Sequence, residues 1–247
     1  MKVDELKCVG CGRCFAYCPV QAKYFRREEP SGRVVATVDE DRCVECGVCQ
    51  RSGVCPNDAL RQEELSWPRM VRAILSNPLL EFKETGVPGR GTEEIKTNEI
   101  TGRIRWGQAG VGVEMGRPGV STSFADVQRV TEKLAAIGVS FCPDNPVTHF
   151  MEDPATGRLR PDILGERALS AIIEFDVPLE RLPQALAALK EAAAEIATVF
   201  SVAVACKQAR EGGFPVLAII EQAGFQVLPN SKNNLGMGRP RFREAGE

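Results

Sequence analysis

Apolar positions in the second half of the chain follow two periods, one typical of strands and one typical of helices. Apolar runs of strand length lie at 109–115, 169–177 and 198–206. Helical spacing marks residues 123–138, where Ser121 or Ser123 can cap the start and Gly138 the end, and also residues 178–197. The inner face of the first of these helices is predicted to carry Val127, Val130, Leu134 and Ile137.

Shorter sequence patterns predict the remaining elements of this region. VSF (139–141) predicts a short strand, residues 148–162 predict a hairpin that turns at PATG, and residues 215–229 predict a last helix and strand. The resulting order, βα-ββ-αβ, is that of a ferredoxin-like α+β sandwich. It also resembles ACT-type regulatory domains, over about 100 residues and in architecture alone, with no diagnostic motif.

A linker is predicted between this region and the N-terminus. Residues 66–76 have the spacing of an amphipathic helix capped by Ser66, whose apolar face would hold Trp67, Met70, Val71, Ile74 and Leu75. Residues 84–103 are polar and rich in Gly, which predicts an extended connector. Neither this stretch nor GQAGVGVEMG (107–116) has the context of a nucleotide-binding loop.

The first 60 residues contain a repeat with a period of 35 residues. VDELKCVGCGRC…CPVQA (3–22) is followed by VDEDRCVECGVC…CPNDA (38–59). Three cysteines at i, i+3 and i+6 can surround one face of a cubane cluster, because Gly12 or Gly47 allows a tight loop around the sulfur atoms. The repeated unit is therefore predicted to bind metal.

Two other uses of these thiols fit less well. A structural zinc site uses two Cys pairs and needs neither a third cysteine at the same spacing nor Cys-Pro. Eight of the ten cysteines lie in the first 55 residues, and no leader is expected in MKVDELKC, so a reducing compartment and metal ligation are favoured over disulfides. A four-iron cluster held by four thiolates has no open position for substrate, which favours electron transfer over Lewis-acid chemistry.

Residues 1–62 resemble the bacterial two-cluster 4Fe-4S ferredoxin family, with Pro19 and Pro56 matching its prolines. The resemblance implies that each fourth cysteine serves the other cluster. The implied ligands of the first cluster are Cys8, Cys11, Cys14 and Cys55. Those of the second cluster are Cys43, Cys46, Cys49 and Cys18. The sequence departs from the family by a longer gap before Cys55, which adds Ser52 and Gly53, and by a longer segment between the motifs, which is expected to form a hairpin turning at PSGR (30–33).

Net charge and the lengths of the apolar runs limit the kinds of partner that the protein is expected to bind. A formal net charge of −2 does not favour nucleic acid, and the apolar runs at 169–175 and 199–205 are too short to span a bilayer, so no membrane insertion is expected. A cytoplasmic protein is predicted.

Two strings outside the repeat share Met-Gly-Arg-Pro. Arg117 and Arg239 could present guanidinium groups to a small anionic ligand or to the acidic rim of a partner, although unrelated turns also explain Gly and Pro. Cys206 is expected to be a small buried residue, Cys142 a loop thiol and His149 a loop or structural histidine.

These features predict an α+β protein with four parts. They are a two-cluster ferredoxin domain (1–62), a linker (63–105), an α+β sandwich (106–228) and a tail (229–247). The leading hypothesis is an iron-sulfur protein that passes single electrons to or from a partner oxidoreductase or complex and is a carrier or electron-transfer subunit rather than an enzyme by itself. The alternative is a redox- or ligand-sensing regulator, and an enzyme with its active site in the sandwich ranks last because no catalytic group of residues can be named.

Overall fold

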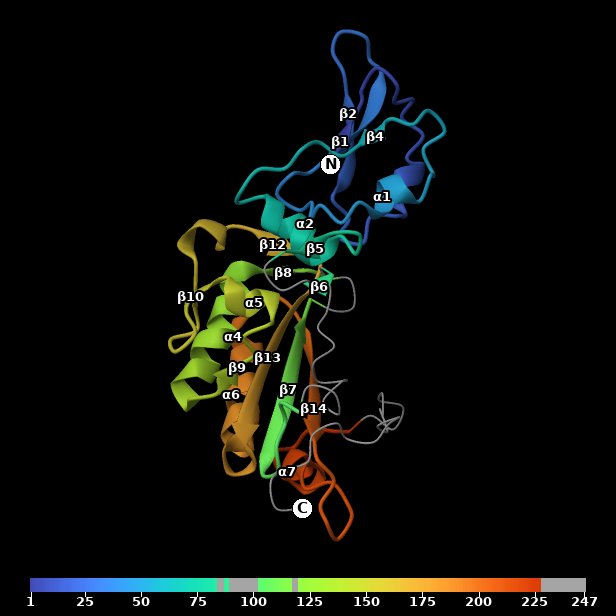
Figure 1. The fold of residues 1–247 in the computed structure, drawn as a ribbon. Coiled ribbons are helices and arrows are strands. Elements are labelled where there is room, and N and C mark those ends of the chain that lie inside the picture. The colour runs from blue at the N-terminus through green and yellow to red at the C-terminus, as the bar shows by residue number, and fades with distance from the viewer. Residues whose placement is uncertain (84–86, 89–101, 117–119, 228–247) are drawn as a thin grey trace.

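A four-stranded antiparallel sheet forms the framework of the second half of the chain (Figure 1). The computed structural model describes residues 1–83, 87–88, 102–116 and 120–227. The strand order is β14-β7-β13-β9, from strands Phe200–Cys206 (β14), Gln108–Met115 (β7), Ala171–Pro178 (β13) and Ser140–Phe141 (β9). With its two long helices in sequence, this region has the expected order βαββαβ, and the fold class is α+β.

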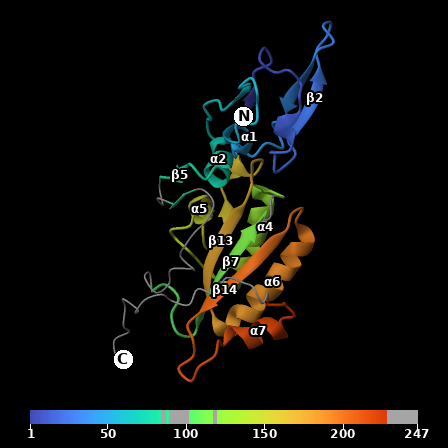
Figure 2. The ribbon, with the colours of Figure 1, turned by 90° about the vertical axis from the view of Figure 1, so that its right-hand side faces the viewer.

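Helices α4 (Phe124–Ile137) and α6 (Leu182–Glu195) cover one face of the sheet (Figure 2). Alternate residues of β7 enter this core, which is why Ala109, Val111, Val113 and Met115 are all fully buried. The Ser123 side chain accepts a hydrogen bond from the Asp126 N–H at 3.1 Å and caps α4. A shorter helix, α7 (Val216–Gln222), packs against α6 and β14.

Small elements surround this framework. They are the strands β5 (Glu81–Phe82), β6 (Val87–Pro88), β8 (Thr122–Ser123), β10 (Met151–Asp153), β11 (Arg158–Leu159) and β12 (Arg167–Ala168), the helix α5 (Pro146–His149) and the 3-10 turns η2 (Pro161–Ile163) and η3 (Leu179–Arg181).

The predicted hairpin at 148–162 forms between β10 and β11, but its first residues are helical. Asn145 caps α5 by accepting the Val147 N–H at 2.8 Å, and Pro146 is suited to the first helical position. The last predicted strand is not formed over residues 225–227, and residues 228–229 lie outside the described ranges.

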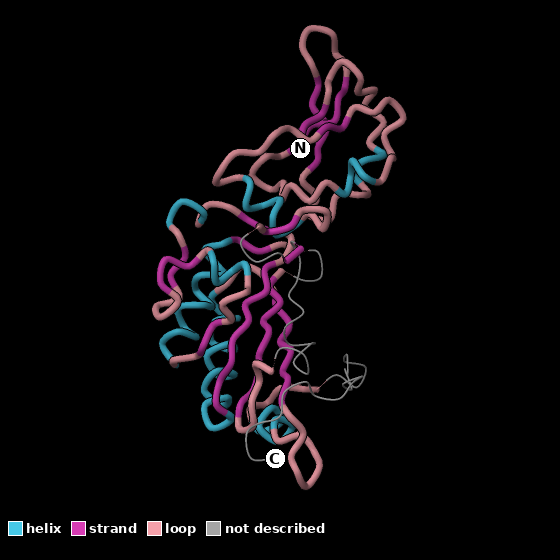
Figure 3. Tube along the Cα trace, viewed as in Figure 1, coloured by secondary structure: helices cyan, strands magenta, loops and turns pink. Residues whose placement is uncertain are grey.

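The N-terminal part consists of short strands and tight loops (Figure 3). A hairpin joins β2 (Lys23–Arg27) to β3 (Val34–Val38), and its turn includes Pro30 to Arg33 as expected. A second pair joins β1 (Lys2–Val3) to β4 (Leu60–Arg61). The remaining elements are the 3-10 turn η1 (Arg13–Phe15) and the helix α1 (Val48–Arg51).

The linker helix α2 (Met70–Ser76) lies between the two parts (Figure 1) and packs on β12. The predicted start at Ser66 is wrong, because Trp67 precedes Pro68 and a residue before proline is disfavoured in helical conformation. The predicted apolar face is also partly wrong. Val71 and Leu75 are buried, but Trp67 and Met70 are 39% and 40% exposed, and the polar Arg72 and Ser76 are buried instead.

Candidate metal centres

The structure brings four thiols from both motifs around one cavity of about 320 Å³. Cys43, Cys46 and Cys49 come from the second motif, while Cys18 comes from the first. Apolar or small residues form most of the remaining wall, including Val20, Ala22, Val38, Val44 and Gly47. We refer to this space as the inner cavity, because the Val44–Cys46 loop packs on Leu169 of the second half.

A second cavity of about 360 Å³, which we refer to as the outer cavity, holds the other four thiols. Cys8, Cys11 and Cys14 come from the first motif and Cys55 from the second. Cys11 is exposed whereas Cys14 is buried, so one side of this cavity is open to solvent. Each cavity is thus lined by three neighbouring cysteines and one from the other motif. That these two sets bind the two clusters stays a prediction.

In each cysteine loop, a glycine in a left-handed conformation precedes a turn of helix. Gly12 has φ of 69° and starts η1, while Gly47 has φ of 68° and starts α1, so Cys14 and Cys49 lie in a tight turn of helix. The added Ser52 and Gly53 follow the four-residue helix α1, with Ser52 as its C-cap, and lie before Cys55. The insertion therefore lengthens a turn and removes no cysteine from the outer cavity.

Backbone N–H groups point at several sulfur atoms. The Ala22 N–H donates to Cys18 Sγ at 3.1 Å, and its repeat counterpart, the Ala59 N–H, donates to Cys55 Sγ at 3.2 Å. The Ala36 N–H donates to Cys8 Sγ at 3.3 Å. Donors of this kind stabilise negative charge on sulfur and help to set the potential of a bound cluster.

Burial acts against ionisation of several of these thiols. It raises the pKa of Cys43 to about 11, and the nearby Glu45 carboxylate adds to the effect. Burial also raises the pKa of Cys14 and of Cys46. Since thiolate is the form that binds iron, metal must displace these protons as it binds.

The donor set fits a four-iron cluster, which takes one thiolate per iron and no other protein group. Each cavity supplies four thiols. In the described part of the chain, no group of three or more His, Cys, Asp or Glu side chains is arranged around a single metal ion.

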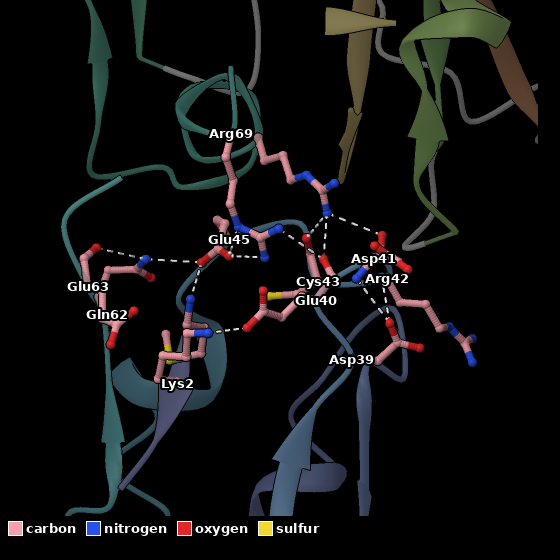
Figure 4. A network of polar contacts seen from close by, with 12 residues as sticks. Lys2, Asp39, Glu40, Asp41, Arg42, Cys43, Glu45, Gln62, Glu63 and Arg69 are labelled. Atoms are coloured by element: carbon pink, nitrogen blue, oxygen red, sulfur yellow. Dashed lines mark hydrogen bonds and ion pairs between the residues drawn. The ribbon is translucent and has the colours of Figure 1, made fainter. Parts of the chain in front are cut away.

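A buried carboxylate adjoins the inner cavity (Figure 4). The side chain of Glu45 is completely buried and accepts hydrogen bonds from the Met1 amine, from Gln62 at 3.0 Å and from Arg69 at 2.6 Å. Burial works to raise the pKa of Glu45, but these donors outweigh it, and the pKa lies below its usual value. Sequence reasoning missed this group, although Glu45 stands where the first repeat has Gly10 and shares its positive φ, at 54° against 66°.

Arg72 of α2 joins the two parts of the chain. Its Nη1 donates to the carbonyl oxygens of Glu40 at 2.8 Å, Asp41 at 3.2 Å and Cys43 at 2.8 Å, and its Nε pairs with the Glu166 carboxylate. The Leu169 N–H donates to Ser76 Oγ at 2.8 Å one turn further along α2. The loop that begins with Cys43 is therefore tied to the second half through one buried guanidinium.

Among the other residues singled out in the sequence, Cys142, Cys206 and His149 line neither cavity. Arg117 and Arg239 lie outside the described residues, so the anionic-ligand or sensor alternative stays a prediction. Cys142 lies in the loop after β9, as expected, and is buried. Cys206 is half-buried at the end of β14. These two cysteines lie at opposite edges of the sheet, and His149 is exposed at the end of α5.

Among the helices that the structure describes, none is both long and apolar enough to cross a bilayer.

Comparison with known proteins agrees with the N-terminal geometry. Residues 7–59 match the model of the 4Fe-4S dicluster domain. Ferredoxin-3 of Rhodobacter capsulatus is 34% identical over 85 residues, which is 27% of this chain and 82% of that protein. An iron-sulfur subunit of the CoB--CoM heterodisulfide reductase of Methanocaldococcus jannaschii is 34% identical over 77 residues, which is 25% of this chain but 11% of that relative.

No solved structure matches the chain. The matched residues contain the eight cysteines of the two cavities, and the match to Ferredoxin-3 covers most of that protein. The chain therefore belongs to the 4Fe-4S dicluster ferredoxin family, as an iron-sulfur electron carrier with two 4Fe-4S clusters.

Proposed function

We propose that this protein passes single electrons to or from a partner oxidoreductase, using one cluster in each cavity. Cys8, Cys11, Cys14 and Cys55 would hold the outer cluster, and Cys43, Cys46, Cys49 and Cys18 the inner cluster. Each cluster supplies a one-electron change without an open site for substrate. The protein supplies the thiolates, the N–H donors to sulfur and a largely apolar wall.

The proposal rests on one observation, which is that the fourth cysteine of each cavity comes from the other motif. Cys18 lies with the three cysteines of the second motif and Cys55 with those of the first. This arrangement places the two cavities side by side in one small domain, which suits electron passage between them.

The second half of the chain is proposed to hold the ferredoxin domain in place on the partner protein. We assign residues 1–62 to the ferredoxin domain, 63–105 to the linker, 106–228 to the α+β sandwich and 229–247 to a tail. A role within a redox complex is supported by one relative, which is named as an iron-sulfur subunit of heterodisulfide reductase. The inner cavity faces the sandwich and the outer cavity has the exposed Cys11, so exchange with the partner is proposed to occur at the outer cluster.

Iron and sulfide analysis tests this function directly. Protein purified without oxygen is expected to contain about eight irons and eight acid-labile sulfides, and its dithionite-reduced form is expected to give the complex EPR signal of two interacting clusters. Cys11→Ala is expected to damage the outer cluster and leave the inner one, with about four irons remaining. Zinc in place of iron, or about four irons in the unaltered protein, would contradict the proposal.

A further inference from the structure

Lys23 breaks the internal repeat at a position beside the inner cavity. The motifs end in CPVQAK and CPNDAL, so Lys23 is the counterpart of Leu60. Leu60 is apolar, 4% exposed and part of the wall of the outer cavity. At the equivalent place the chain has an ammonium group.

The Lys23 ammonium is enclosed and unpartnered in the described structure. Lys23 begins β2 opposite Val38, and its Nζ is buried with no hydrogen-bond partner among the described residues. A long lysine side chain normally reaches water with its charged end, because an unpaired buried charge is costly. The position therefore needs an anionic group that the polypeptide itself does not supply.

Thiols of the inner cavity surround the same space. Lys23 lines this cavity together with Cys18, Cys43, Cys46 and Cys49. The inner cavity would hold a cluster of net negative charge once four thiolates bind it.

We propose that the Lys23 ammonium is a counter-charge for the inner cluster, a positioning residue that makes this cluster easier to reduce. The inference rests on the proposed function. Reduction adds a negative charge to a cluster, and a fixed positive charge in a weakly polar interior stabilises that form. A donor to cluster sulfur acts in the same direction, because net charge and hydrogen bonds to sulfur set the potential. Lys23 therefore favours the reduced state of the inner cluster.

EPR-monitored redox titration of the whole protein tests this role. At a fixed ambient potential, Lys23→Met is expected to lower the ratio of reduced to oxidised inner cluster about tenfold, equal to about 59 mV for one electron. Lys23→Arg, which keeps the charge, is expected to stay near the unaltered protein. Arg27→Met, which removes an exposed charge at the other end of β2, is the matched control and is expected to cause no shift.

The potentials and the cluster content of the variants together test the role of Lys23. Unchanged potentials in Lys23→Met with both clusters present, shown by iron content, would overturn the proposal. Lys23→Gln is the second neutral variant, and loss of clusters in both neutral variants but not in Lys23→Arg supports a required positive charge. Loss in all three would mean that the lysine only fills space. Fewer than two clusters in the unaltered protein would count against the proposed function instead.

Discussion

Cys18→Ala is expected to destroy the inner cluster, although Cys18 belongs to the first motif. The side chain lies in the cavity of Cys43, Cys46 and Cys49, so its loss leaves one iron of that cluster without a thiolate. The Ala22 N–H would also lose its sulfur acceptor. Iron content is expected to fall from about eight to about four per chain.

The EPR spectrum of the remaining cluster shows which site was lost. The signal of Cys18→Ala is expected to match that of Cys46→Ala and to differ from that of Cys11→Ala, because only the first two remove ligands of the inner cavity. Cys206→Ala, a half-buried thiol far along the chain at the end of β14, is the matched control and is expected to retain all the iron. A spectrum of Cys18→Ala that matches Cys11→Ala would mean that each motif binds its own cluster.

Arg72→Met is expected to lower the free energy of unfolding by about 3–5 kcal/mol, the usual cost of removing one partner of a buried ion pair. The change leaves Glu166 without its partner and removes the donor shared by the carbonyls of Glu40, Asp41 and Cys43. Methionine preserves much of the side-chain volume, so the loss is mainly polar. Since Arg72 ties the Cys43 loop to the second half of the chain, the inner cluster is expected to be lost earlier than the outer one.

Urea unfolding under anaerobic conditions, followed by far-UV circular dichroism and by cluster absorbance, measures this effect. The control is Arg158→Met, which removes an exposed pair with Glu132 at 3.5 Å and is expected to cost less than about 1 kcal/mol. Equal midpoints for the two variants would show that Arg72 does not couple the cluster loop to the sandwich.

The pattern of residues along the chain was enough to predict those elements whose conformation is set by residues close in sequence. The repeat around Cys8 and Cys43, with its left-handed Gly12 and Gly47, predicted two tight metal-binding loops. Alternation and helical spacing predicted β7, β13, β14, α4 and α6. The predicted start of α2 at Ser66 was too early. It followed the cap signal of Ser66, although Pro68 disfavours a helical conformation at Trp67.

The polar groups beside the cavities depend on contacts between residues far apart in sequence. Arg72 reads as a solvent-facing residue of an amphipathic helix, yet it is buried because the carbonyls of 40, 41 and 43 and the carboxylate of Glu166 meet it there. Glu45 lies on a left-handed turn that a glycine would occupy more easily, and its buried carboxylate is stabilised by donors from residues 1, 62 and 69.

Thiol spacing and turn chemistry act over a few residues, so the order of amino acids was enough to indicate which residues could bind iron. The charges beside these thiols could not be predicted in the same way. Lys23 is enclosed, and Glu45 and Arg72 are buried with their partners, because distant segments pack together, and the electrostatic effect of a charge depends on that packing rather than on its neighbours along the chain.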